Sequence, residues 1–132
     1  IVSNGKEAIG IATEMDYVTE RIASELSVCQ RVIIESNHDI DMLKRGPYPP
    51  YLKVRIMSDK GHISNAVCAE EVKKLYKSGT MRFILGHLSL NNNTPLLAQS
   101  TSESALMDLS AKNGKDYILN VAKPKGNGVI VI

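Results

Sequence analysis

The sequence contains no tryptophan, a single phenylalanine and only two cysteines among its 132 residues. Cys29 and Cys68 lie in apolar or helical surroundings without Cys-x-x-Cys spacing, which favours reduced, packed thiols over a disulfide or zinc framework. No stretch approaches the about 20 consecutive apolar residues of a transmembrane helix, and no basic-then-apolar leader opens the chain. We therefore expect a soluble cytoplasmic protein.

The chain also has no large excess of charge of one sign. Its 16 basic and 14 acidic residues give a formal net charge of +2, so any nucleic-acid contact has to depend on a local basic patch. Hydrophobic residues make up 43% of the sequence, which is enough for one sizeable core. We expect a single domain over residues 1–132.

Short apolar runs alternate with segments of helical periodicity. The opening Asn-Gly pair predicts a hairpin, and the prolines of 46–50 predict a rigid loop. Strands are expected over 8–13, 31–35, 81–85, 117–121 and 129–132, and helices over 17–26, 51–57, 64–79 and 94–113. This alternation indicates an α/β fold with a mostly parallel sheet.

All three histidines, His38, His62 and His87, fall in polar blocks near apolar runs. Polar groups at the ends of parallel strands gather at one edge of a sheet. The histidines, together with carboxylates of the chain, supply the ligand types that a divalent transition metal needs. The candidate carboxylates are Glu14, Glu35, Asp39 and Asp59. The alternative, in which each histidine is a hydrogen-bonded structural residue, stays open.

Glu35 follows three β-branched residues, so it either emerges at the end of the sheet or is a buried charge that needs a partner. One possible partner is a histidine, because a carboxylate that orients an imidazole creates an acid/base pair for hydrolysis. The other is a lysine or arginine in an ordinary salt bridge.

The segment 44–55 interleaves four basic side chains with two tyrosines. Lys44, Arg45 and Tyr48 could grip phosphates and stack on bases, although a solvated, proline-stiffened loop has the same composition. The asparagines 91–93 are typical of a turn and helix cap. Asn92 could still help to shape the edge of the sheet at which His87 is expected to lie.

Several motifs occur in order between about residues 9 and 98. They are Gly-Ile-Ala-Thr13, Glu-Ser-Asn-His-Asp39, Gly-Pro-Tyr-Pro49, Ser-Asp-Lys-Gly-His-Ile-Ser-Asn65, His-Leu-Ser89 and Asn-Asn-Thr-Pro95. Together they resemble small bacterial cytoplasmic hydrolases of the metallo-β-lactamase superfamily, which are related to phosphodiesterases and thought to act on DNA. The resemblance implies a four-layer αββα sandwich of two similar halves, with a dinuclear metal site between them.

The resemblance also implies roles for individual residues. His87 matches the last metal-binding histidine, and Glu14 matches the carboxylate that bridges two metals. The family has Asp followed by Thr-Gly at that point, whereas this chain has Glu14 followed by Met15 and Asp16. His62 and Glu35 resemble a catalytic acid and the carboxylate that orients it. His38 receives no role.

The superfamily's His-x-His-x-Asp-His block does not occur in the sequence. We therefore expect this chain to be a carboxy-terminal half that binds metal weakly, hydrolyses little alone and forms a homodimer in place of the missing amino-terminal half. The parent protein is expected to hold two Zn or Mn ions and to cleave phosphodiesters in DNA as an exonuclease. The competing hypothesis is a non-catalytic structural or interaction domain without a complete metal site.

Overall fold

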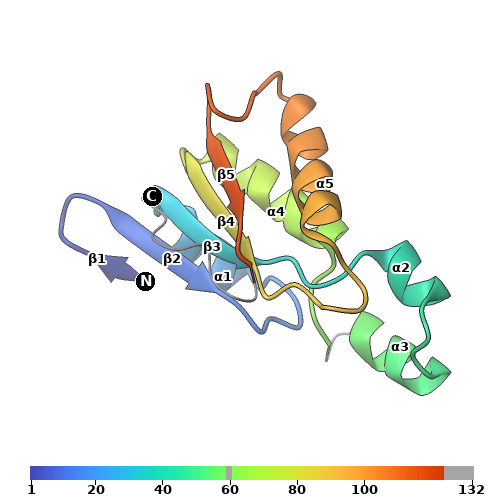
Figure 1. Ribbon diagram of the computed structural model, residues 1–132. Coiled ribbons are helices and arrows are strands. Elements are labelled where there is room, and N and C mark those ends of the chain that lie inside the picture. The colour runs from blue at the N-terminus through green and yellow to red at the C-terminus, as the bar shows by residue number, and fades with distance from the viewer. Residues whose placement is uncertain (59–60, 124–132) are drawn as a thin grey trace.

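The chain forms a sheet with helices packed beside it, as the computed structural model describes for residues 1–58 and 61–123 (Figure 1). The strands are β1 (Val2–Ser3), β2 (Ala8–Ala12), β3 (Arg31–Glu35), β4 (Arg82–Gly86) and β5 (Ile118–Val121). The helices are α1 (Glu20–Leu26), α2 (Ile40–Arg45), α3 (Pro50–Met57), α4 (Asn65–Lys77) and α5 (Pro95–Met107).

The strands lie side by side in the order β1-β2-β3-β4-β5. β1 and β2 are antiparallel and form the expected hairpin, in which Gly5 adopts a φ of +84° that suits glycine. The pairs β2/β3, β3/β4 and β4/β5 are all parallel. The α/β fold and the mostly parallel sheet are thus confirmed, while the expected strand 129–132 lies outside the described residues.

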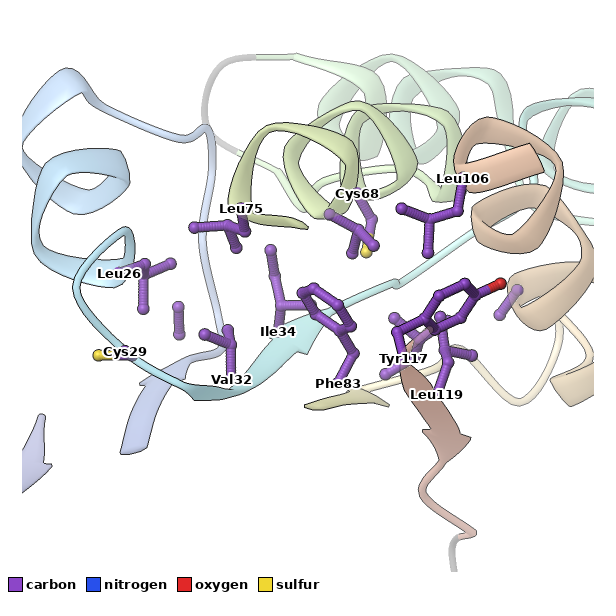
Figure 2. Packing of buried hydrophobic residues seen from close by; sticks show 14 of the residues in the cluster. Leu26, Cys29, Val32, Ile34, Cys68, Leu75, Phe83, Leu106, Tyr117 and Leu119 are labelled. Carbon is purple, nitrogen blue, oxygen red and sulfur yellow. The ribbon is translucent and has the colours of Figure 1, made fainter. Parts of the chain in front are cut away.

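The hydrophobic core lies between one face of the sheet and the helices α1, α4 and α5 (Figure 2). Alternate strand residues point toward the helices, because successive side chains of a strand face opposite sides. The strand contribution comes from Val32, Ile34, Phe83, Leu85 and Leu119, and the helices contribute Leu26, Cys68, Val72, Leu75 and Leu106. The helix expected over 64–79 thus packs an apolar stripe, made of Cys68, Val72 and Leu75, against the sheet.

The other face of the sheet also carries apolar side chains. It carries alternate isoleucines, of which Ile11 is 57%, Ile118 37% and Ile84 only 7% exposed. The isoleucines are Ile9, Ile11, Ile33, Ile84 and Ile118, and the polar residues Arg31, Arg82 and Asn120 share the face with them. Large apolar side chains on a sheet face are stabilised when a second layer covers them. This face bears on the oligomeric state that we propose below.

Two helices begin where their capping residues predict. The Ser64 hydroxyl accepts from Val67 N (3.3 Å) at the start of α4, and Thr94 accepts from Leu97 N (3.1 Å) at the start of α5. Pro95 occupies the first helical position of α5, where its missing N–H costs no hydrogen bond.

Three expected helix boundaries were wrong. α1 begins at Glu20 rather than at 17, because Thr19 caps it by accepting from Ile22 N at 3.1 Å. α5 ends at Met107 rather than near 113, and Ser110 beyond it has a left-handed φ of +59°. The third helix of the chain begins at Pro50 rather than at 51.

The short helix α2 was missed entirely. Asp39 caps it by accepting from Met42 N at 2.8 Å, and Leu43 is its one buried residue. A single buried position gives no apolar periodicity, so the sequence carried only the capping signal.

Both cysteines are free and buried, as expected. Burial raises the pKa of Cys68 to about 12 and also raises that of Cys29, so each is held as a thiol. Within the described part of the chain, the helices are too short or too polar to cross a bilayer.

Candidate active site

Two neighbouring strand ends and one helix start bring together a carboxylate and two imidazoles. Glu35 is the last residue of β3, and His87 directly follows β4. The two strands are parallel and Glu35 pairs with Gly86, so both side chains reach the same edge of the sheet. His62 lies just before α4, and one potential ligand atom from each of the three residues lies within 4.8 Å of the others.

Glu35 is fully buried at 0% exposure and uses both of its oxygens. Its Oε1 lies 2.7 Å from His87 Nδ1 and 2.8 Å from His62 Nδ1. Its Oε2 accepts from Met15 N at 2.6 Å. The partners of this buried carboxylate are therefore histidines rather than a lysine or arginine, which decides between the two possibilities left open by the sequence.

The two histidines contact Glu35 differently. His87 Nδ1 makes an aligned hydrogen bond, whereas His62 Nδ1 is close to the same oxygen but has no aligned hydrogen-bond partner among the described residues. The rings meet edge to face, with centroids 5.0 Å apart and an interplanar angle of 67°. A buried ring nitrogen without a partner beside a carboxylate suits a site that takes up a cation.

The donor set fits a divalent metal. One carboxylate and two imidazoles are the ligands of many catalytic zinc centres, which leave a further position for water or substrate. A carboxylate that holds imidazole Nδ1 also fixes the ring tautomer and leaves Nε2 available on the opposite side. Glu35 can therefore either ligate directly or orient the two histidines.

Left-handed backbone occurs at the two residues expected to be metal ligands. Glu14 has φ of +58° and His87 has φ of +56°; within the described residues, Ser110 is the other non-glycine residue with positive φ. Such torsions are uncommon outside glycine and concentrate at functional positions.

Glu14 is adjacent to the three-residue cluster but is not part of it. The next residue, Met15, donates its N–H to Glu35, while the Glu14 side chain lines a separate cavity of about 510 Å³ with Asp16. Its role as a metal ligand stays a prediction.

Asp39 and His38 are not members of this three-residue cluster, although His38 lines a cavity together with His62. Asp39 caps α2, which occupies its carboxylate with a backbone N–H. His38 is buried, and burial lowers its pKa and favours the neutral ring. Its carbonyl accepts from Asn65 N at 2.8 Å, so its backbone has a structural function. Asp59 lies outside the described residues.

A cavity of about 430 Å³ opens beside both site histidines. Tyr48 and Arg55 line it, and the Tyr48 hydroxyl accepts from Asn91 Nδ2 at 2.9 Å. Arg55 was not singled out as a site residue. The signal for it was available, because Leu52, Arg55 and Ile56 lie three and four residues apart and share one face of α3.

The other predicted substrate-binding residues lie at different depths. Lys44 and Arg45 are exposed in the last turn of α2, where Arg45 lies 3.9 Å from Asp41. Asn92, in contrast, is only 1% exposed, and its carbonyl accepts from Asp39 N at 2.8 Å. We therefore leave Asn92 out of the substrate-binding surface that we propose.

A buried polar network beneath the cluster was not foreseen. Asn65 and Asn93 exchange side-chain amide hydrogen bonds of 2.9 Å, and the Ser36 hydroxyl donates to Asn65 Oδ1 at 2.7 Å. The network joins the residue after Glu35, the start of α4 and the asparagine loop. Asn91 and Asn92 lie in the expected turn, where their backbone N–H groups donate to the Ser89 hydroxyl, but the cap of α5 is Thr94 rather than an asparagine.

Curated proteins from two bacteria are similar to this chain. Exodeoxyribonuclease YycJ of Bacillus anthracis is 31% identical over 122 residues, which cover 92% of this chain and 46% of that protein. Exodeoxyribonuclease WalJ of Streptococcus pneumoniae is 36% identical over 107 residues, which cover 81% of this chain and 40% of that protein. No protein-family profile and no solved structure matches. The match thus covers most of this chain. The chain spans less than half the length of these relatives, which are named as exodeoxyribonucleases.

Proposed function

We propose that this chain is the carboxy-terminal half of a metal-dependent hydrolase that cleaves phosphodiester bonds in DNA as an exonuclease. The observation that carries the proposal is the convergence of Glu35, His62 and His87 at one edge of the sheet. The names of the relatives support DNA as the substrate, and the share of their length that the chain spans supports a missing half. The expected cytoplasmic location is part of the same prediction.

His87 and Glu14 are the residues of this chain that would hold metal, two Zn or Mn ions in the full-length protein. The metal would activate water and neutralise charge on the phosphate when bound. Glu35 contributes by accepting from His87 Nδ1, which keeps Nε2 of that ring free to bind a cation.

His62 is suited to protonate the leaving oxygen. Its ring is 36% exposed, lines the cavity and has the buried Glu35 carboxylate 2.8 Å from Nδ1, so that Nε2 can face a substrate in the cavity. Arg55 and Tyr48 in the same cavity, together with Lys44 and Arg45 on α2, would bind phosphates and bases of the DNA.

Replacing His62 by alanine in the full-length protein is expected to lower the rate of DNA digestion by about 10²-fold or more, because a general acid contributes that much. Zinc affinity, measured by calorimetry, should change little. The matched variant His87→Ala should lose both metal and activity. Loss of metal from His62→Ala would show instead that His62 is a ligand, and an unchanged rate would remove its role in catalysis.

A non-catalytic interaction domain is the second candidate function. It is favoured by the position of Glu14 outside the three-residue cluster and by the sequence's lack of the histidine-rich ligand block. DNA digestion by the full-length protein distinguishes this candidate, because a non-catalytic domain predicts that His62→Ala leaves the rate unchanged. Tight zinc binding by the 132-residue chain alone, measured by calorimetry, would contradict both this candidate and the proposal of a half site.

The chain alone is expected to form a two-fold dimer through the isoleucine face of the sheet. An apolar face of roughly several hundred Å² seldom stays exposed to water, and a second copy can cover it in place of the missing half. Light scattering should give twice the chain mass, and Ile11→Lys should reduce it to the monomer. A monomer at high concentration would contradict the expected dimer.

A further inference from the structure

Asn37 is hydrogen-bonded to both histidine segments of the site. Its backbone N–H donates to the carbonyl of Ile63, the residue after His62, at 3.0 Å. Its side-chain Nδ2 donates to the carbonyl of His87, also at 3.0 Å. Asn37 is nearly buried, so water does not readily replace these bonds.

The bond to His87 acts at a strained point of the backbone. His87 has a left-handed φ of +56°, which a residue with a side chain adopts only when its surroundings impose it. The peptides on either side are held by main-chain bonds, from Ser36 N to Gly86 O (2.9 Å) and from Ser89 N to Asn37 O (2.8 Å). The His87 carbonyl itself is held by the Asn37 side chain.

Asn37 is in turn fixed from below by the buried amide network. Asn93 Nδ2 donates to the carbonyls of Ser36 (2.8 Å) and Asn37 (3.0 Å), and the Asn93 amide is locked against Asn65. A side chain anchored in this way can hold a strained peptide in one orientation.

We infer that Asn37 is a positioning residue that keeps His87 in its left-handed conformation, and thereby keeps Nδ1 of His87 on Glu35 and Nε2 free. The importance of a free Nε2 rests on the proposed function, in which His87 binds metal. The inference about the ring itself rests on the hydrogen bonds alone, so the two can be tested separately.

The test replaces Asn37 by alanine in the 132-residue chain and follows the histidine rings by nitrogen-15 NMR. The spectra are recorded without metal, at one fixed pH well above the pKa of about 6.5 of free histidine. In the unaltered chain we expect His87 to carry its proton on Nδ1. In the variant, His87 should shift toward the Nε2-protonated form while His62 keeps its signals. Zinc affinity of the full-length protein should fall by about 10- to 100-fold, as for other residues that orient a metal ligand.

The matched control is Asn113→Ala, which removes a comparable bond from an asparagine side chain to a backbone carbonyl, that of Leu119. It should lower stability without moving the His87 signals. Asn37→Asp is the second variant, because it keeps the shape and replaces the donor by an acceptor; it should shift His87 in the same way even if Asn37→Ala does not fold.

Three results would overturn the inference. They are an Nε2-protonated His87 in the unaltered chain, an unchanged His87 tautomer in a folded Asn37 variant, and unfolding of both Asn37 variants, which would indicate a purely structural role. A shifted tautomer together with a full-length protein that does not digest DNA would support the inference and reject the proposed function.

Discussion

Under the proposed function, Glu35→Gln is expected to lower the rate of DNA digestion by the full-length protein by at least about 10²-fold, because it removes the carboxylate that binds His87 Nδ1 and lies 2.8 Å from His62 Nδ1. Glutamine has the shape of glutamate but only one acceptor oxygen. If that oxygen accepts from Met15 N, the amide N–H groups face Nδ1 of His62 and His87, and the rings must then carry their protons on Nε2. If the oxygen faces the histidines instead, the amide N–H groups oppose the Met15 N–H.

The second arrangement leaves a donor facing a donor in a buried place, and the first forces both rings out of the tautomer that the Glu35 carboxylate favours. The unfolding free energy should therefore fall by about 1–3 kcal/mol, which chemical denaturation can measure. Zinc affinity should fall as well, since a proton on Nε2 blocks that ligand atom. All three effects arise from replacing one carboxylate oxygen of Glu35 by an amide nitrogen.

Glu71→Gln is the matched control for this experiment. Glu71 is also a buried carboxylate, at 3% exposure, but its partner is Lys74 at 3.2 Å on the same helix α4. This variant should digest DNA at the normal rate. If Glu35→Gln also retained the normal rate, Glu35 would have no orienting role in the reaction.

Gly61→Ala is expected to disturb the site through the backbone, with a loss of about 10²-fold in the rate of DNA digestion, the effect typical of a misplacement of about 1 Å. A Cβ at this position would overlap the carbonyl oxygen of Ile56 and lie 2.6 Å from that of Arg55. Backbone oxygens at the end of α3 cannot rotate away as a side chain can. The segment that carries His62 must therefore move.

Gly86→Ala provides the comparison, because it also places a methyl group directly before a site histidine. The Cβ at Gly86 would lie 3.8 Å from Ile33 Cγ2, which is ordinary contact. This variant should keep both its stability and its rate of DNA digestion. Equal rates for the two variants would contradict the expectation that His62 depends on close backbone packing at Gly61.

The convergence of the site could be predicted because few interactions determine it. Glu35 ends β3 and His87 follows the adjacent parallel strand β4, and apolar runs identify both strands in the sequence. The capping residues Ser64 and Thr94 likewise predicted where two helices begin. The apolar runs and capping residues are local signals, and tertiary packing did not move the strands or the helix starts that they predict.

Other features depended on tertiary contacts that a sequence pattern does not encode. Asn92 and Asn93 are neighbours in an all-polar run, yet both are buried because backbone and amide groups far away in the chain supply their partners. The side-chain bond from Asn37 to the carbonyl of His87 spans 50 residues. Neither helical periodicity nor residue spacing identifies such pairs.

The left-handed residues Glu14 and His87 follow the two strands that flank β3 on either side. Glycine would adopt the same torsions without steric conflict, so selection for thermodynamic stability alone would favour glycine at both positions. Non-glycine residues at such positions are typical of functional sites, where activity is favoured over thermodynamic stability. Stabilising this protein by consensus or glycine substitution should therefore avoid these two positions.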